Sequence, residues 1–162
     1  MERVSKHNYY LDIAQTVAER STCLRKMYGA IIVKNDVIIS TGYNGAPRGR
    51  KNCCDIGSCM RDKLQIPRGE RYELCRSVHA EANAIISASR DQMLGATLYM
   101  VGVDAKTKDL ISGTSSCMMC KRQVLNAGID YVVIRDTREE FRVIPTSEWI
   151  EFDDSLSGVF GY

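Results

Sequence analysis

The sequence has no long hydrophobic run and no strong excess of charge. No apolar stretch in its 162 residues approaches the roughly 20 needed to cross a bilayer, and the opening segment MERVSKHNYYLDIAQ lacks the apolar core of a secretory signal. The 22 basic and 20 acidic residues give a net charge of +2, too small to indicate a general nucleic-acid-binding surface. We therefore expect a cytoplasmic protein that binds neither membranes nor nucleic acid.

Internal repeats are also absent, and the length matches one domain, which we place at residues 1–162. A hydrophobic content of 44% is enough for one packed core. The seven cysteines are an odd number, and in a reducing compartment they fit metal ligands and buried thiols better than disulfides.

The hydrophobic pattern predicts an α/β fold in which helices cover both faces of a sheet. The first half predicts a helix, two strands joined by an Asn35-Asp36 hairpin turn and a long aperiodic segment, at residues 8–20, 29–34, 37–43 and 44–77. The second half predicts helices at residues 79–90 and 117–127, strands at 96–103, 129–135 and 141–145, and a tail at 155–162.

Two short motifs contain the parts of a catalytic zinc site. Residues 79–85 read HAEANAI and residues 114–120 read TSSCMMC. A catalytic zinc needs three protein ligands and one open position for water, and His79, Cys117 and Cys120 form such a set. Glu81 is the natural proton carrier beside it. H-x-E followed by P-C-x-x-C is the known signature of zinc-dependent base deaminases.

One position departs from that signature, because Ser116 stands where the pattern has Pro. We expect Ser116 to cap the following helix by accepting a backbone N–H bond, so the ligands are retained and only the rigidity of the loop changes. The alternative is a closed, structural zinc site with an unrecognised fourth ligand.

The resemblance extends beyond these ligands. The segments STC (21–23), GYNGAPRG (42–49), HAEANAI and CMMCKRQVLNAGI (117–129) together resemble the deoxycytidylate deaminase family over residues 8–135. Membership implies a cytidine-deaminase-like, three-layer α/β/α sandwich around a mixed sheet of about five strands. It also implies hydrolysis of dCMP to dUMP and ammonia, which supplies thymidylate synthesis.

The resemblance implies a role for individual residues. It makes His79, Cys117 and Cys120 the zinc ligands, Glu81 the proton shuttle and Asn44 a substrate contact. The residue type supports Asn44 independently, because an amide in a tight Asn-Gly turn offers both a donor and an acceptor. The alternative for Asn44 is ordinary hairpin chemistry.

A nucleotide substrate requires a cation for its 5′-phosphate. Arg90 is our first candidate, because a continuous helix would place it on the face of His79, about 16 Å further along the axis. Arg25 and Lys26 are second candidates from the resemblance. The alternative for each is a solvated surface charge.

The remaining cysteines could hold a second, structural zinc. Some family members carry such a zinc with ligands that correspond to Cys23 and Cys53, and Cys59 and Cys75 would complete the set. Cys54, adjacent to Cys53, leaves the choice of ligand open. Buried thiols or redox-active cysteines are the alternative.

The resemblance further implies a homohexamer activated by dCTP and inhibited by dTTP. Arg48, Arg50 and Lys51 could hold such a triphosphate, with Mg²⁺ accompanying it, although basic loops are more often simply solvated.

Two other functions fit the same residues. One is another zinc deaminase, acting on cytidine, guanine, a riboflavin precursor or a tRNA adenosine; a free-nucleoside enzyme would not need Arg90, and the small net charge argues against tRNA. The other is a catalytically silent protein that senses nucleotides, which would have no need of Glu81.

Overall fold

A five-stranded mixed sheet forms the centre of the molecule in the computed structural model, which describes residues 1–156. The spatial order is β2-β1-β3-β4-β5. The β3–β4 pair is parallel, and the other three neighbouring pairs are antiparallel. The strands are β1 Lys26–Lys34, β2 Val37–Tyr43, β3 Thr97–Asp104, β4 Tyr131–Arg135 and β5 Phe141–Pro145.

The central strands are buried on both faces, so their side chains alternate between two cores. On β1, Ala30 and Ile32 point to one core whereas Ile31 and Val33 point to the other. This period of two is what a pleated strand imposes. Strands of this kind read as continuous apolar runs, which is why the sequence reveals them.

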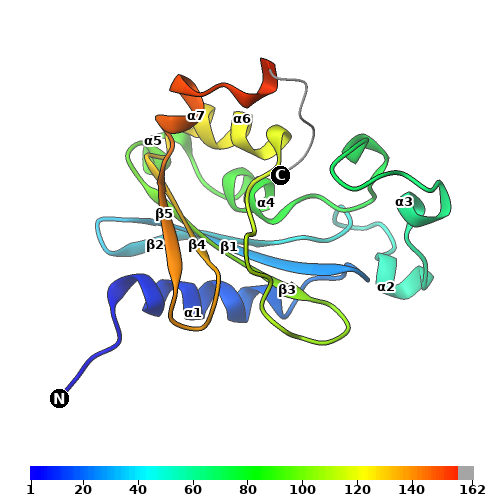
Figure 1. Ribbon diagram of the computed structural model, residues 1–162, viewed down its shortest axis with the longest axis horizontal. Coiled ribbons are helices and arrows are strands. Elements are labelled where there is room, and N and C mark those ends of the chain that lie inside the picture. Colours follow the sequence, from blue (N-terminus) through cyan, green and yellow to red (C-terminus); the bar gives the residue numbers. More distant parts are fainter. Residues whose placement is uncertain (157–162) are drawn as a thin grey trace.

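Helices cover both faces and make the three-layer sandwich that we expected (Figure 1). Among residues 1–156, one face carries a single helix, α1 (Lys6–Ala18). The opposite face carries α4 (Ala80–Ile86), α5 (Arg90–Met93) and α6 (Met118–Ala127), with the short α7 (Glu148–Glu151) beyond them.

Two glycines let helices lie unusually close to the sheet. A Cβ at Gly29 would lie 2.0 Å from the Ala14 carbonyl oxygen of α1, and a Cβ at Gly42 would lie 2.4 Å from the Ala80 carbonyl oxygen of α4. Contacts this short are sterically forbidden, so only glycine allows either approach. Gly42 therefore fixes the distance between the sheet and the helix that follows His79.

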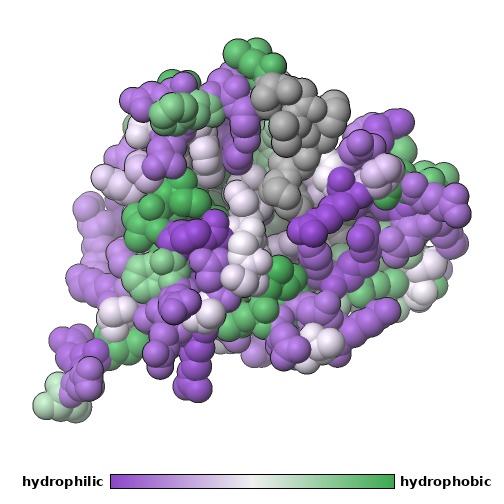
Figure 2. Space-filling model, viewed as in Figure 1, coloured by the Kyte–Doolittle hydropathy of each residue, from purple (hydrophilic) through white to green (hydrophobic). Residues whose placement is uncertain are grey.

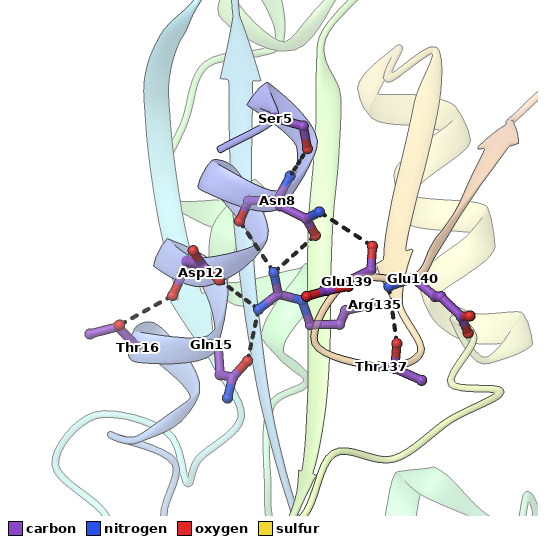
Figure 3. A network of polar contacts seen from close by, with 9 residues as sticks. All are labelled: Ser5, Asn8, Asp12, Gln15, Thr16, Arg135, Thr137, Glu139 and Glu140. Carbon is purple, nitrogen blue, oxygen red and sulfur yellow. Dashed lines mark hydrogen bonds and ion pairs between the residues drawn. The ribbon is translucent and has the colours of Figure 1, made fainter. Parts of the chain in front are cut away.

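A buried arginine fastens α1 to the sheet (Figure 3). Arg135, at the end of β4, is 1% exposed, and its guanidinium forms a 2.8 Å ion pair with Asp12. It also donates to Gln15 Oε1 at 2.9 Å and to the backbone oxygen and Oδ1 of Asn8. Removing this side chain would leave several acceptors at the helix–sheet junction without their donor.

The aperiodic segment folds into short helices at one end of the sheet. It contains α2 (Cys53–Ile56), α3 (Met60–Lys63) and a single 3-10 turn, η1 (Tyr72–Leu74). On the face in Figure 2, hydrophilic side chains are mixed with small hydrophobic groups. Within residues 1–156, every helix is too short or too polar to serve as a membrane span.

The prediction of one continuous helix over residues 79–90 is wrong, because two helices occupy this stretch. α4 ends at Ile86, and Ser89 begins α5 by accepting the N–H of Gln92 while the Gln92 side chain accepts the N–H of Ser89. This reciprocal capping box is a strong start signal and outweighs the apolar spacing that runs through it.

The hairpin prediction is confirmed. Asn35 and Asp36 join β1 to β2 with φ values of 51° and 64°, the pair of positive angles that a two-residue hairpin turn requires. The predicted tail begins with the 3-10 turn η2 (Asp154–Leu156), and its residues 157–162 lie outside the described part of the chain.

Candidate metal centre and substrate cavity

The two predicted ligand motifs meet because each stands at the start of a helix. His79 is the N-cap of α4 and Cys117 is the N-cap of α6. Cys117 Sγ accepts the backbone N–H of Cys120 at 3.4 Å, so Cys117 caps the helix. Our expectation that Ser116 would cap it is wrong. Ser116 is fully buried, and its side chain acts on the Glu81 carboxyl group, whose pKa it lowers by a smaller effect than the burial that raises it.

The three predicted ligands converge on one point. The donor atoms of His79, Cys117 and Cys120 all lie within 4.8 Å of one another. His79 Nδ1 is 3.5 Å from Cys117 Sγ and 3.3 Å from Cys120 Sγ, so this ring nitrogen faces both sulfurs. One imidazole and two thiols are a donor set that suits zinc, and three ligands leave a fourth position open.

Hydrogen bonds within this cluster shift the pKa values of its side chains. The bond with the Cys120 thiol lowers the pKa of Cys117 to about 4, and His79 adds to the effect. Burial alone would lower the pKa of His79, but its hydrogen bonds with Cys117 and Cys75 outweigh burial and raise that pKa to about 10. These hydrogen bonds lower the pKa of Cys117 and so favour its thiolate, the form in which sulfur binds a metal.

Glu81 lies in the first turn of α4, beside the ligand cluster. It is 5% exposed, and burial raises the pKa of its carboxyl group above the usual range, although the nearby His79 opposes this. A carboxyl group with a raised pKa can both accept and release a proton near neutral pH, as a general acid–base catalyst must.

A cavity opens directly above His79, Glu81 and Cys117. Tyr28 and Tyr72 contribute aromatic surface to its walls, and Ser77 contributes a buried hydroxyl that has no hydrogen-bond partner within residues 1–156. Flat aromatic surface and a free hydroxyl suit a planar ring that carries polar groups.

Asn44 also lines this cavity, but most of its amide is already bonded within the protein. Its Oδ1 accepts from the Tyr28 N–H at 2.8 Å and from the Ser21 hydroxyl, and its Nδ2 donates to the Lys26 carbonyl at 2.8 Å. One N–H remains to face the cavity. Asn44 is not in a tight Asn-Gly turn, because Gly45 pairs with Val78 as an isolated β-bridge.

Four cations also line the cavity: Arg25, Lys26, Arg61 and Arg68. Burial, followed by the charges of Arg68 and Arg25, lowers the pKa of Lys26. Only Arg25 among them has an acidic partner in the described structure, Asp62 at 3.3 Å. Like charges held this close favour binding of an anion.

Arg90 does not lie at this cavity, so the geometric reason for choosing it fails. It begins α5, its Nε donates to the Asn126 carbonyl at 3.0 Å, and it lines a separate hollow with Arg122 and Met119 of α6. The eleven-residue spacing from His79 was meaningful only for the continuous helix that the structure lacks.

The other predicted cysteines surround the cavity without forming a compact ligand set. Cys23, Cys59 and Cys75 line it, and Cys53 lies near enough for the other three to raise its pKa, although burial raises it more. Within residues 1–156, His79, Cys117 and Cys120 are the one group of three or more metal-binding side chains whose donor atoms lie within 4.8 Å of one another. The arrangement therefore does not support a second zinc.

The three basic residues predicted to bind an effector, Arg48, Arg50 and Lys51, are exposed and do not line the cavity above His79. The sequence reasoning also missed residues that do line it. Arg61, Arg68 and Tyr72 lie in the aperiodic segment, where no periodic pattern assigns a side chain to one face. The run PRGERYE contains two arginines and a tyrosine close to the HAE motif, but this spacing has no known chemistry attached to it.

Comparisons with known proteins agree with this geometry. A family model described as the cytidine and deoxycytidylate deaminase zinc-binding region matches residues 4–135. The deoxycytidylate deaminase of Mycobacterium phage D29 is 35% identical over 139 residues, which cover 82% of this chain and 96% of the phage protein. The deoxycytidylate deaminase of Schizosaccharomyces pombe is 34% identical over 131 residues, which cover 81% of this chain but only 37% of that protein.

Solved structures give the same result. The dCMP deaminase of cyanophage S-TIM5 in apo form has a TM-score of 0.58 and 26% sequence identity, and the match covers 83% of this chain and 85% of that one. Its complex with dCMP and dUMP has a TM-score of 0.55 and 25% identity, with 83% and 84% coverage. The matched family region contains all three converging ligands and Glu81. This chain is a member of the cytidine and deoxycytidylate deaminase family.

Proposed function

We propose that this protein catalyses the hydrolytic deamination of dCMP to dUMP and ammonia, and so supplies dUMP for thymidylate synthesis. One observation carries the proposal: two of the three converging metal ligands, His79 and Cys117, and the buried Glu81 line a cavity whose cationic rim is formed by Arg25, Lys26, Arg61 and Arg68. A ring could reach the ligands and Glu81 while an anionic group reaches the rim.

His79, Cys117 and Cys120 would hold the zinc ion. Bound there, zinc supplies a Lewis acid that lowers the pKa of water enough for it to act as a nucleophile near neutral pH. The capping of α6 by Cys117 and the close approach of α4 to Gly42 fix the three ligands relative to one another. The site is thus built on two helix starts and not on flexible loop tips.

Glu81 would carry the protons. It takes one proton from the attacking water and gives it to the ring nitrogen beside the attacked carbon. It then takes the proton of the newly added hydroxyl group and gives it to the departing amine, so that the C–N bond breaks, ammonia leaves and the carbon becomes a carbonyl. Its raised pKa strengthens the carboxylate as a base toward the attacking water, which favours its role as a proton carrier.

Arg25, Lys26 and Arg68 would bind the 5′-phosphate, in place of Arg90. The free N–H of Asn44 and the hydroxyl of Ser77 are placed to bond to the sugar or the base. Relatives named deoxycytidylate deaminase, and the S-TIM5 complex with dCMP and dUMP, support a nucleotide substrate. Activation by dCTP with Mg²⁺, inhibition by dTTP, the homohexamer and the cytoplasmic location stay predictions.

The loss of cytosine absorbance tests the proposal. Zinc-loaded protein is incubated with dCMP, deoxycytidine and dCTP, each with and without added dCTP and dTTP. We expect fast turnover of dCMP alone, and a change in that rate on adding either triphosphate would establish regulation. Faster turnover of deoxycytidine than of dCMP would make the protein a nucleoside deaminase, and no turnover of any substrate would contradict the proposal.

A further inference from the structure

Arg61 is a charged side chain buried in the outer wall of the cavity. It is 6% exposed, and its Nη2 donates to the Pro67 carbonyl at 2.9 Å and to the Glu70 carbonyl at 2.8 Å. Burying a guanidinium group is costly unless hydrogen bonds compensate it, and here the acceptors are neutral backbone oxygens of one loop. The charge of Arg61 thus holds the loop of residues 64–71 against α3.

That loop needs such a support because its backbone is strained. Gln65 and Arg71 have φ values of 53° and 51°, in the left-handed region that residues other than glycine seldom adopt. Each such residue costs about 1 kcal/mol or more and persists only where surrounding contacts impose it. The two bonds from Arg61 fall between these strained positions, at Pro67 and Glu70.

Two side chains of the cavity depend on this loop. The guanidinium carbon of Arg61 lies 4.6 Å from the centre of the Tyr72 ring, and that ring meets the His79 ring edge-on, with centroids 5.1 Å apart. Arg68, between the two carbonyls that Arg61 holds, lines the same cavity and is close enough to Lys26 to lower its pKa. Arg61 therefore connects the cationic rim to the metal ligand.

We propose that Arg61 is a positioning residue that shapes the 64–71 loop, so that Arg68 faces the 5′-phosphate and Tyr72 supports His79, and that it thereby sets the preference for a nucleoside monophosphate over a nucleoside. This inference rests on the proposed dCMP deamination. Arg68 acts on the phosphate directly, whereas Arg61 acts through Arg68 and Tyr72. Loss of Arg61 should therefore remove the contribution of Arg68 as well.

The test compares Arg61→Met, Arg68→Ala and the double variant, with kcat and KM measured on dCMP and on deoxycytidine. Arg68→Ala should raise the KM for dCMP about 10- to 100-fold, the usual range for a lost charged hydrogen bond, and leave deoxycytidine unaffected. Arg61→Met should raise the KM for dCMP by a similar factor and also lower kcat on both substrates. The double variant should resemble Arg61→Met in its KM.

Lys63→Ala is the matched control, because Lys63 is an exposed cation on the same short helix and should leave all four constants unchanged. If Arg61→Met does not fold, Arg61→Lys carries the test, since a lysine keeps the charge but cannot bond two carbonyls in one plane while it covers the Tyr72 ring. An unchanged ratio between dCMP and deoxycytidine in the Arg61 variant would overturn the inference. An additive double variant would also overturn it and make Arg61 a direct phosphate ligand.

The affinities for dUMP and for deoxyuridine, measured by calorimetry, report the same preference for the phosphate without turnover. Arg61→Met and Arg68→Ala should each weaken dUMP binding and leave deoxyuridine binding unchanged. A protein that is inactive on dCMP but shows this binding pattern would overturn the proposed reaction and uphold the role of Arg61. A protein that deaminates dCMP without this pattern would uphold the reaction and overturn the role of Arg61.

Discussion

On each face of the sheet a helix packs closely against a glycine, but only one of the two helices leads to the candidate metal centre. On one face, α1 rests on Gly29 and is fastened by the buried Arg135, and none of these residues lines the cavity above His79. On the other face, α4 rests on Gly42 and is preceded by its N-cap His79, a proposed metal ligand. A change on the first face should therefore affect stability alone, whereas a matched change on the second should affect stability and catalysis together.

The largest effect should come from the second face, at Glu81. Glu81→Gln keeps the size of the side chain but cannot accept and release a proton, so kcat on dCMP should fall by about 10²- to 10⁴-fold. Zinc content, measured by atomic absorption, should stay at the wild-type level because Glu81 is not one of the three converging ligands. Glu19→Gln on the α1 face is the control and should keep full activity; equal losses in both variants would contradict the division between faces.

Gly42→Ala and Gly29→Ala make the comparison directly. Each adds a methyl group at a contact of 2.4 Å or less to helix backbone, so each should destabilise the fold by about 1–3 kcal/mol, read from urea unfolding. Only Gly42→Ala moves α4, and a displacement near 1 Å at the reacting groups costs about 100-fold in rate. Comparable kcat values for the two folded variants would show that α4 does not transmit its position to the site.

Arg135→Ala should destabilise the protein without changing its catalytic rate. It removes the donors that Asn8, Asp12 and Gln15 share and leaves a void at the helix–sheet junction, a loss of about 3 kcal/mol. Thermal unfolding measures this loss, and kcat well below the transition should match that of the wild type. Arg138→Ala, which removes an exposed arginine three residues later, should change neither quantity.

The smallest effect concerns the loop before Cys117. Hydrogen bonding from Arg142 lowers the pKa of Asp136, and Arg142 also donates to the Thr114 carbonyl, which steadies that loop. A lowered folded-state pKa gives stability that is present above the unfolded pKa and is lost as pH falls through the folded value. Asp136→Asn should therefore lower stability by less than about 1 kcal/mol at pH 7 and by nothing in strong acid. A difference that persists at low pH would exclude this ion pair as the cause.

The sequence revealed the features that depend on local signals. The hairpin turn was predictable at Asn35 and Asp36 because few residues tolerate two successive positive φ angles. The central strands were predictable because both of their faces are buried, which makes them continuous apolar runs. The convergence of His79, Cys117 and Cys120 was predictable because the spacing of such a set is fixed by the chemistry of a catalytic zinc and not by the rest of the fold.

The outer wall of the cavity was not predictable, and the reasons are physical. The buried guanidinium group of Arg61 donates to neutral backbone carbonyls of the neighbouring 64–71 loop. No pattern in the sequence distinguishes such an arginine from a solvated one. Arg90 was misplaced because the Ser89 capping box was read as part of a continuous apolar pattern. Asn44 was assigned to a turn because Asn-Gly usually forms one, whereas here a β-bridge to Val78 keeps Gly45 extended.

Measuring deaminase activity as a function of the amount of bound zinc tests the central claim most directly. Metal-free protein is titrated with zinc while deamination of dCMP is followed by absorbance. Because His79, Cys117 and Cys120 are the one compact ligand group in the described chain, we predict that activity is absent without zinc, rises linearly and saturates at one zinc per chain. Full activity in zinc-free protein, or no activity at any zinc concentration, would contradict it.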